Sequence, residues 1–158
     1  MKHKNTTYDY AELQKELLPQ LRETVFHVTS GSGLKKILAE KKILPNINNC
    51  FEYSHLQSKN SFGIKKGYVC LFDLRDKTAQ TLEQTLDYQY FLSNHNWNIN
   101  AFLILDVAAH KDLIPNEAAV GSNKMHIPEV EVWSSTPIPL TKISNIIEVQ
   151  ITNRPDPF

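Results

Sequence analysis

The chain has 158 residues, of which 41% are hydrophobic and 22% are charged. These fractions match ordinary globular domains, so they exclude wholesale disorder and predict a single domain over residues 1–158. Seventeen basic and 17 acidic residues give a net charge of zero, which excludes a global field that attracts nucleic acid. A local patch around Lys59, Lys65 and Lys66 could still do so, although solvated surface lysines explain these residues as well.

No apolar stretch approaches the ~18 residues that cross a bilayer, and the polar residues 1–5 do not resemble a signal peptide. We therefore expect a cytoplasmic protein without membrane partners. The two cysteines and the histidines show no metal-ligand spacing, so no metal site is predicted. Cys70 lies in an apolar run and is expected to be a buried thiol. A disulfide between Cys70 and Cys50 is the alternative.

The first part of the chain predicts two helices around a short strand. Apolar residues recur at three- and four-residue steps over residues 8–22, which predicts an N-terminal amphipathic helix that Pro19 splits near its end. A β-rich strand follows at residues 25–29. Ser30 or Ser32 can then cap a helix that continues to about Glu40.

The rest of the chain alternates strands with loops and one helix. Residues 45–62 are polar and without periodicity, which is typical of a functional loop. The pattern then predicts strands at 68–72, 101–106, 129–133 and 146–151, a helix at 81–92, a loop at 111–124 and a short helical turn at 140–144. Because βαβ alternation does not persist, we expect an α+β fold. No complete glycine-rich nucleotide motif is present, which argues against a Rossmann or P-loop fold.

The strand at residues 25–29 places a histidine and a threonine on one face. Side chains alternate along a strand, so His27 and Thr29 lie opposite the apolar pair Phe26 and Val28. If that pair faces the core, His27 can offer a donor and an acceptor nitrogen to a ligand, and Thr29 can offer a hydroxyl. The alternative is a histidine whose hydrogen bonds are satisfied by a neighbouring backbone group.

The same alternation applies to the strand at residues 129–133. Glu129 and Glu131 share one face with Trp133, opposite two valines. Carboxylates are costly to bury alone, so this face is expected to meet water, basic groups or a ligand. A solvated edge strand explains the pattern. A glutamate that binds a ribose hydroxyl and stabilises positive charge on an anomeric carbon explains it as well.

Tyr68 and Arg75 flank the strand at residues 68–72. The Tyr68 ring can stack on a planar group, and the Arg75 guanidinium can bind a pyrophosphate or a substrate group. Taken singly, Tyr68 can be a packing residue and Arg75 a surface partner of Asp73 and Asp76.

These motifs together resemble the ADP-ribosyltransferase superfamily. Phe26-His27-Val28-Thr29, followed by a helix and Ile43-Leu44-Pro45, is similar to its opening. Within it, the motif order is most similar to bacterial toxins that ADP-ribosylate DNA on thymidine. Their Tyr-Val strand leading to an arginine resembles residues 68–75, and their C-terminal strands resemble residues 128–132 and 138–146. The likeness covers residues 24–151.

The resemblance implies a split, mixed β-sheet with flanking helices that binds NAD, as a substrate, in a cleft. It assigns His27, Thr29 and the adjacent Ser30 to the ribose side of NAD and Tyr68 to the nicotinamide pocket. It makes Glu129 the catalytic carboxylate and Arg75 a positioning group. Such a site requires His27 and Glu129 to face each other across one cleft.

Two features depart from the toxin pattern. Arg75 falls one residue nearer the tyrosine than in the toxins. The Glu-x-Glu arrangement also leaves two candidates for the catalytic acid. The motif order favours Glu129, whereas superfamily members with Glu-x-Glu use the second acid, here Glu131.

The implied activity is transfer of ADP-ribose to a macromolecular acceptor, which can be DNA, RNA or protein, with release of nicotinamide. A neutralising antitoxin is an expected partner of such a toxin-like enzyme. One alternative is RNA 2′-phosphotransferase chemistry, which also consumes NAD and needs clustered basic residues. The other is a catalytically inactive module that binds NAD or a partner.

Overall fold

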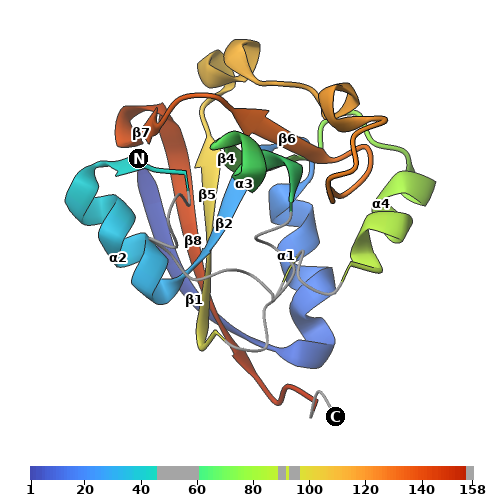
Figure 1. The fold of residues 1–158 in the computed structure, drawn as a ribbon. Coiled ribbons are helices and arrows are strands. Elements are labelled where there is room, and N and C mark those ends of the chain that lie inside the picture. The colour runs from blue at the N-terminus through green and yellow to red at the C-terminus, as the bar shows by residue number, and fades with distance from the viewer. Residues whose placement is uncertain (46–60, 89–91, 93–96, 156–158) are drawn as a thin grey trace.

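A six-stranded mixed sheet forms the centre of the molecule (Figure 1). The computed structural model describes residues 1–45, 61–88, 92 and 97–155. The strand order is β1-β8-β5-β2-β4-β6, in which only the β1–β8 pair is parallel. The strands are β1 (Lys2–Asp9), β2 (Val25–Ser30), β4 (Val69–Asp73), β5 (Ile99–Leu105), β6 (Glu131–Ser134) and β8 (Ile143–Thr152). The predicted α+β class with a mixed sheet is therefore confirmed.

Helices cover both faces of this sheet. Helix α2 lies on one face, and helices α1 and α4 lie on the other (Figure 1). A small second sheet pairs β3 with β7. The helices and short strands are α1 (Leu13–Leu21), α2 (Gly31–Glu40), β3 (Lys42–Ile43), α3 (Phe62–Lys66), α4 (Ala79–Leu86) and β7 (Ile138–Pro139). Short 3-10 helices occupy Tyr10–Glu12, Val107–Asp112, Asn116–Ala119 and Leu140–Lys142.

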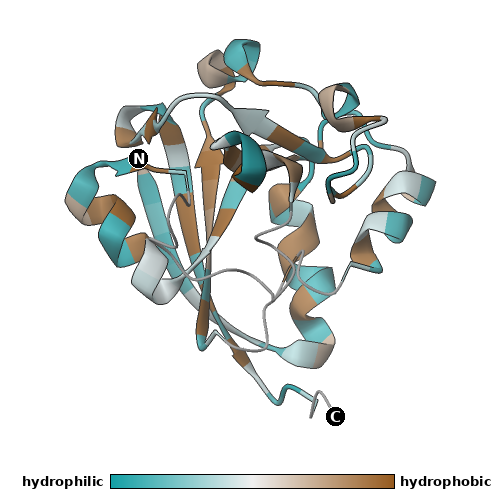
Figure 2. Cartoon of the chain, viewed as in Figure 1, coloured by the Kyte–Doolittle hydropathy of each residue, from teal (hydrophilic) through white to brown (hydrophobic). Residues whose placement is uncertain are grey.

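Each face of the sheet carries its own apolar core. Phe26, Phe102 and Val149 pack with α1 and α4, while Leu103 and Ile146 pack with α2. The strands between these cores are apolar on both sides, as Figure 2 shows for β5. A strand covered on both faces is expected to lose simple alternation between apolar and polar residues. This explains why the apolar pair Phe26 and Val28 does not mark the only core face.

The N-terminal segment differs most from the prediction. Residues 2–9 form strand β1, and the helix expected at 8–22 is a 3-10 turn followed by α1 at Leu13–Leu21. Pro19 does not split this helix, because it lies within the last turn of α1. The sheet consequently begins at residue 2 and not near residue 24. Strand β1 was missed because its side chains are polar and its pairing partner is the last strand.

Most other elements agree with the sequence prediction within a few residues, but the helix predicted at 81–92 is α4 at Ala79–Leu86 and ends six residues earlier. Helix α2 begins after Ser30, whose hydroxyl accepts the Gly33 N–H at 3.0 Å, so Ser30 and not Ser32 is the cap. The predicted loop at 111–124 contains a 3-10 helix, and the short α3 was not predicted. The predicted loop at 45–62 falls almost wholly outside the described residues. No helix in the described ranges is both long enough and apolar enough to cross a membrane.

Close packing of α3 against β4 and β6 depends on a glycine. A Cβ atom on Gly63 would overlap the Trp133 indole and lie 2.6 Å from the Cys70 sulfur. Trp133 is fully buried, and its ring centroid lies 4.7 Å from that of Phe62. Only glycine therefore allows α3 to approach the sheet this closely.

We expect Gly63→Ala to destabilise the protein by about 1–3 kcal/mol, because a buried ring must move. Urea denaturation measures this change in unfolding free energy. Gly31→Ala is the matched control, since its Cβ would meet the Ile99 Cβ at 3.2 Å, a contact that needs a shift of only a few tenths of an ångström. Equal stability of the two variants would contradict the packing argument.

Candidate functional site

The sheet opens between β2 and β4 directly beside His27. The two strands pair only through Val25↔Asp73 and Phe26↔Phe72, whereas β2 continues to pair with β5 as far as Ser30. His27 Nδ1 lies 2.8 Å from the Cys70 carbonyl oxygen on β4. Since a carbonyl can only accept, Nδ1–H donates and the imidazole bridges the opening.

This bond also fixes what His27 can offer to a ligand. Burial lowers the pKa of His27, and the bond to Cys70 opposes that shift only in part. The ring is therefore neutral near pH 7, with Nδ1 protonated and Nε2 available as an acceptor. The backbone-satisfied histidine foreseen as the alternative is present, but it occupies only one of the two nitrogens.

Thr29 and Ser30 follow His27 at the end of β2. Thr29 lies on the same strand face as His27 and is half-buried. A Cβ at residue 33 would overlap the Thr29 hydroxyl, so Gly33 lets the first turn of α2 sit against that hydroxyl. The Ser30 hydroxyl caps α2 and lies 3.0 Å from the Ser32 hydroxyl. The Ser30 hydroxyl is thus committed to the cap of α2, and the Thr29 hydroxyl lies against the first turn of the same helix.

Glu129 does not lie on a strand, so the predicted shared face of Glu129 and Glu131 is wrong. Glu129 has a φ of 66°, which is left-handed, and β6 begins only at Glu131. The turn breaks the alternation from which the shared face was inferred. The Glu129 carboxylate is exposed and accepts a 2.9 Å hydrogen bond from the Thr81 hydroxyl of α4. It is therefore directed toward α4 and not toward His27.

Glu129 borders a separate open groove. The groove has a volume of about 480 Å³ and is lined by Thr81, Gln84, Thr85, Asp87, Tyr88, Pro128 and Glu129. None of the residues at the β2–β4 opening contributes to it. The sequence thus assigned Glu129 and Glu131 to one site, whereas only Glu129 borders this groove.

Glu131 is buried although β6 is an edge strand, so the solvated face expected here is not present at this position. Its side chain is 7% exposed, and its Oε2 atom accepts the Ile127 N–H at 2.8 Å. Burial raises the pKa of Glu131 to about 7, although the bond from Ile127 opposes the shift. Glu131 stands opposite Phe72 on β4, and Trp133 stands opposite Cys70.

Cys70 connects the histidine and the buried acid. Its carbonyl accepts from His27, and its side chain is a free thiol. Burial raises the pKa of the Cys70 thiol, and the negative charge of Glu131 raises it further. Strand register places Glu131 on the α4 face, with Phe72 and Phe26, and His27 on the α2 face. The two side chains therefore lie on opposite faces of the sheet, with β4 between their strands.

Asn116 holds the turn that carries both glutamates, and the sequence did not single it out. Its Nδ2 donates to the carbonyls of Ile127 and Glu131 at 3.0 and 2.9 Å, and its Oδ1 accepts the Glu129 N–H at 3.0 Å. The side chain is 8% exposed. A buried asparagine with every polar group bonded to one turn fixes the conformation of that turn. A polar residue in a predicted loop gave no signal of this role.

Tyr68 lies next to the opening, within an aromatic cluster. It directly precedes β4, and its backbone N–H donates to the Gly63 carbonyl at 2.8 Å. Its ring meets Phe62 edge-on, with 6.3 Å between centroids. Tyr68 is half-buried, so its packing against Phe62 leaves part of the residue exposed.

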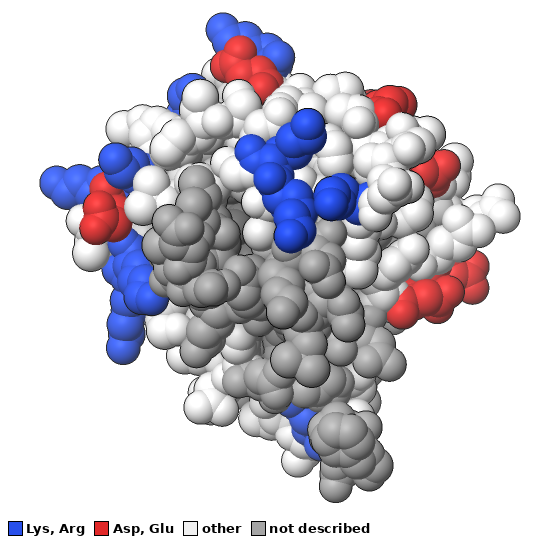
Figure 3. All heavy atoms as spheres, viewed as in Figure 1, with Lys and Arg blue, Asp and Glu red and all other residues white. Residues whose placement is uncertain are grey.

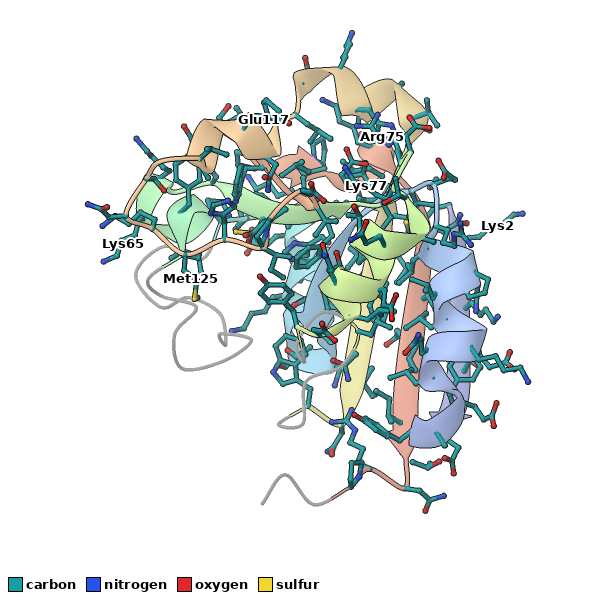
Figure 4. The ribbon with its side chains drawn as sticks, turned by 90° about the vertical axis from the view of Figure 1, so that its right-hand side faces the viewer. Lys2, Lys65, Arg75, Lys77, Glu117 and Met125 are labelled. Carbon is teal, nitrogen blue, oxygen red and sulfur yellow. The ribbon has the colours of Figure 1, made fainter. Side chains whose placement is uncertain are left out.

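Arg75 lies beyond the other end of β4, away from His27. Its guanidinium bonds both Asp73 oxygens, at 3.0 and 2.8 Å, and approaches His110 Nδ1 at 3.1 Å. Although burial opposes it, hydrogen bonding to Arg75 lowers the pKa of Asp73. Burial, together with the charge of Arg75, lowers the pKa of His110. Figure 4 shows Arg75 beside Lys77, at the far end from Lys65. The structure thus supports the ion-pair interpretation of Arg75.

His27 contacts β4 through Cys70, and Tyr68 directly precedes that strand. Glu131 lies on the neighbouring strand β6, on the opposite face of the sheet from His27. Glu129 and Arg75 lie apart from His27, at the turn before β6 and beyond the far end of β4. Within the described residues, no group of three or more His, Cys, Asp or Glu side chains is placed to hold a metal ion. No protein-family model, curated protein or solved structure matches this chain.

We expect Asn116→Ala to lower the unfolding free energy by about 1–3 kcal/mol, because it leaves buried backbone groups without partners. Urea denaturation provides the measurement, and Asn123→Ala, at an exposed loop position, is the control. Amide exchange at residues 127–131 should accelerate in the Asn116 variant alone. Unchanged exchange there would show that Asn116 does not hold the turn.

Glu131 is expected to make stability fall as pH rises. Its pKa is about 7 in the folded protein and ordinarily 4.5, so its stabilising contribution is complete below pH 4.5 and lost as pH rises through 7. At about 1.36 kcal/mol per pKa unit, the loss is about 3 kcal/mol. Urea denaturation across this window should show the loss in the wild type and not in Glu131→Gln. If the unfolding free energies of the two proteins changed with pH in parallel, the assignment of this loss to Glu131 would be wrong.

Proposed function

We propose that this protein is an ADP-ribosyltransferase-like enzyme that cleaves NAD at the opening between β2 and β4. The observation that carries the proposal is the His27 bridge across that opening, with the buried Glu131 on the next strand beyond Cys70. The resemblance of the chain's motifs to the superfamily supplies the reaction. Glu131, and not Glu129, is the proposed catalytic carboxylate.

Each residue around the opening has chemistry suited to NAD. The free Nε2 of His27 can accept a ribose hydroxyl, and the Thr29 hydroxyl can bond the same sugar. The Tyr68 ring offers an apolar edge or face to nicotinamide. These groups bind and orient the nicotinamide riboside half of the substrate.

Glu131 would stabilise the reaction's positive charge. Departure of nicotinamide breaks the ribose C1–nitrogen bond, and the bonding electrons leave with nicotinamide. The sugar becomes oxocarbenium-like, and an ionised carboxylate beside it lowers the barrier. An acceptor oxygen or nitrogen then bonds to C1 and releases its proton.

The raised pKa of Glu131 is compatible with this role. Near pH 7 the free protein contains both protonated and ionised Glu131. The pyridinium of NAD is positively charged, and an opposite charge nearby lowers the pKa of a carboxyl group. Substrate binding would therefore favour the ionised form.

A basic surface beside the opening favours a nucleic acid as the acceptor. Lys65 and Lys66 end helix α3, and Figure 3 shows basic side chains gathered over this helix. The Phe62 N–H of α3 donates to the Met125 carbonyl at 2.8 Å, which brings the neighbouring Lys124 to the same side. These lysines can neutralise phosphates near Tyr68. RNA 2′-phosphotransfer would use the same surface, and an RNA bearing a 2′-phosphate distinguishes it by loss of that phosphate.

We expect Glu131→Gln to reduce NAD cleavage by about 10²–10³-fold, as removal of a charge-stabilising group does. Nicotinamide release in the presence of DNA, RNA or protein acceptors is the measurement. Glu129→Gln is the matched control and should retain activity. For the wild type, kcat/KM should rise with pH through about 7, following the pKa of Glu131.

His27→Ala should weaken NAD binding, measured by calorimetry, because it removes the ribose contact. Turnover that survives both Glu131→Gln and His27→Ala would overturn the proposal. Absence of NAD binding at millimolar concentration would instead favour a catalytically inactive partner-binding module.

A further inference from the structure

Strand β1 forms one edge of the six-stranded sheet, and β6 forms the other. All eight residues of β1 pair with β8, from Lys2↔Asn145 to Asp9↔Thr152. No strand in the described part of the chain pairs with the outer side of β1. Figure 4 shows Lys2 pointing away from the body of the molecule at this margin. The outer backbone groups of an edge strand are a template for another strand.

The devices that usually block edge pairing are weak in β1. It contains no proline, and its register with β8 is unbroken. His3 Nε2 lies 2.6 Å from Glu148 Oε2, and Lys4 Nζ donates to Gln20 Oε1 at 3.3 Å. Two of its three basic side chains are therefore drawn over the faces of their own subunit. The central residues 5–8 carry no charge, so they oppose pairing least.

The charge pattern of β1 selects a second copy in antiparallel orientation. The strand begins with basic Lys2 and ends with acidic Asp9. Parallel pairing of two copies would place lysine beside lysine, whereas antiparallel pairing places the basic half of each copy against the acid-ended half of the other. Like charges directly across strands destabilise a pair, so the antiparallel orientation is favoured because it separates the lysines and the aspartates of the two copies.

Symmetry limits the possible registers. Facing residue pairs in two antiparallel strands alternate between a hydrogen-bonded and a non-hydrogen-bonded type. In a symmetric dimer the two-fold axis exchanges the strands, so it must pass through the centre of one such pair. One residue must therefore lie opposite its own copy. The registers that keep most of β1 paired centre this contact on Asn5 or Thr6.

We propose that two copies of this chain form a dimer by antiparallel β1–β1 pairing, which joins their sheets into one continuous sheet. The inference does not rest on the proposed activity, because β1 lies at the sheet edge remote from β4 and β6.

Sedimentation velocity of the full chain tests this pairing. The wild type should sediment with twice the 18.1 kDa subunit mass. Asn5→Lys combined with Thr7→Lys places lysines opposite each other in both registers, so this exposed-site variant should show a twofold lower mass with an unchanged circular dichroism spectrum. Gln80→Lys with Asn123→Lys adds the same charge at exposed positions elsewhere and should leave the dimer intact. A monomeric wild type, or a dimer that survives the β1 lysines, overturns the proposal.

Cross-linking tests the geometry independently of stability. In a Cys50→Ser chain, Asn5→Cys or Thr6→Cys places two thiols on the axis, where facing Cβ atoms are about 4.5–5.5 Å apart. One of the two variants should form an intermolecular disulfide under mild oxidation, seen as a dimer on a non-reducing gel. Asn123→Cys should not. Failure of both β1 variants to cross-link more than Asn123→Cys refutes the pairing.

Discussion

The candidate site depends on one hydrogen bond, from His27 Nδ1 to the Cys70 carbonyl. Strands β2 and β4 stop exchanging backbone bonds after Phe26, so a carbonyl that the ladder no longer satisfies needs another donor. The imidazole supplies that donor and spans the opening. One side chain therefore both stabilises the divided sheet and leaves its second nitrogen free for chemistry.

A buried acid near this opening requires a rigid support on its own strand. The raised pKa of Glu131 reflects burial that a single backbone N–H compensates only in part. Asn116 fixes the preceding turn through three hydrogen bonds, so the carboxylate cannot easily rotate into water. The left-handed Glu129 belongs to the same turn, so two acids only two residues apart differ in burial, with Glu129 exposed and Glu131 buried.

Local signals in the sequence were sufficient for β2 and α2. The β-rich residues 25–29 and the serine cap act within a few positions, so propensity and capping identify both elements. They were insufficient for β1, whose polar residues form a strand only because β8 lies beside them. The alternation rule failed at Glu129 because this left-handed residue lies in a turn, and the strand begins only at Glu131.

The site was accessible to sequence reasoning only in part. His27 and Thr29 lie on a strand that the sequence predicted, and Tyr68 directly precedes another, so pattern reasoning located all three along the chain. The pairing of Arg75 with Asp73 was foreseen as an alternative, and its distance from His27 follows from the strand's length. Asn116 could not be identified, since burial of a loop asparagine arises from tertiary contacts alone.

The parallel pairing of the first strand with the last also governs the order in which the protein folds. His3 and Glu148 are separated by 145 positions along the chain, so this contact closes a loop that includes nearly every residue. Strand β8 must leave the ribosome before it can align β1 and β5, which it separates in the sheet. Contacts of such long range slow folding. A nascent chain would therefore expose the apolar faces of β5 until β8 has been synthesised, and exposed apolar surface of this kind favours aggregation of the growing polypeptide.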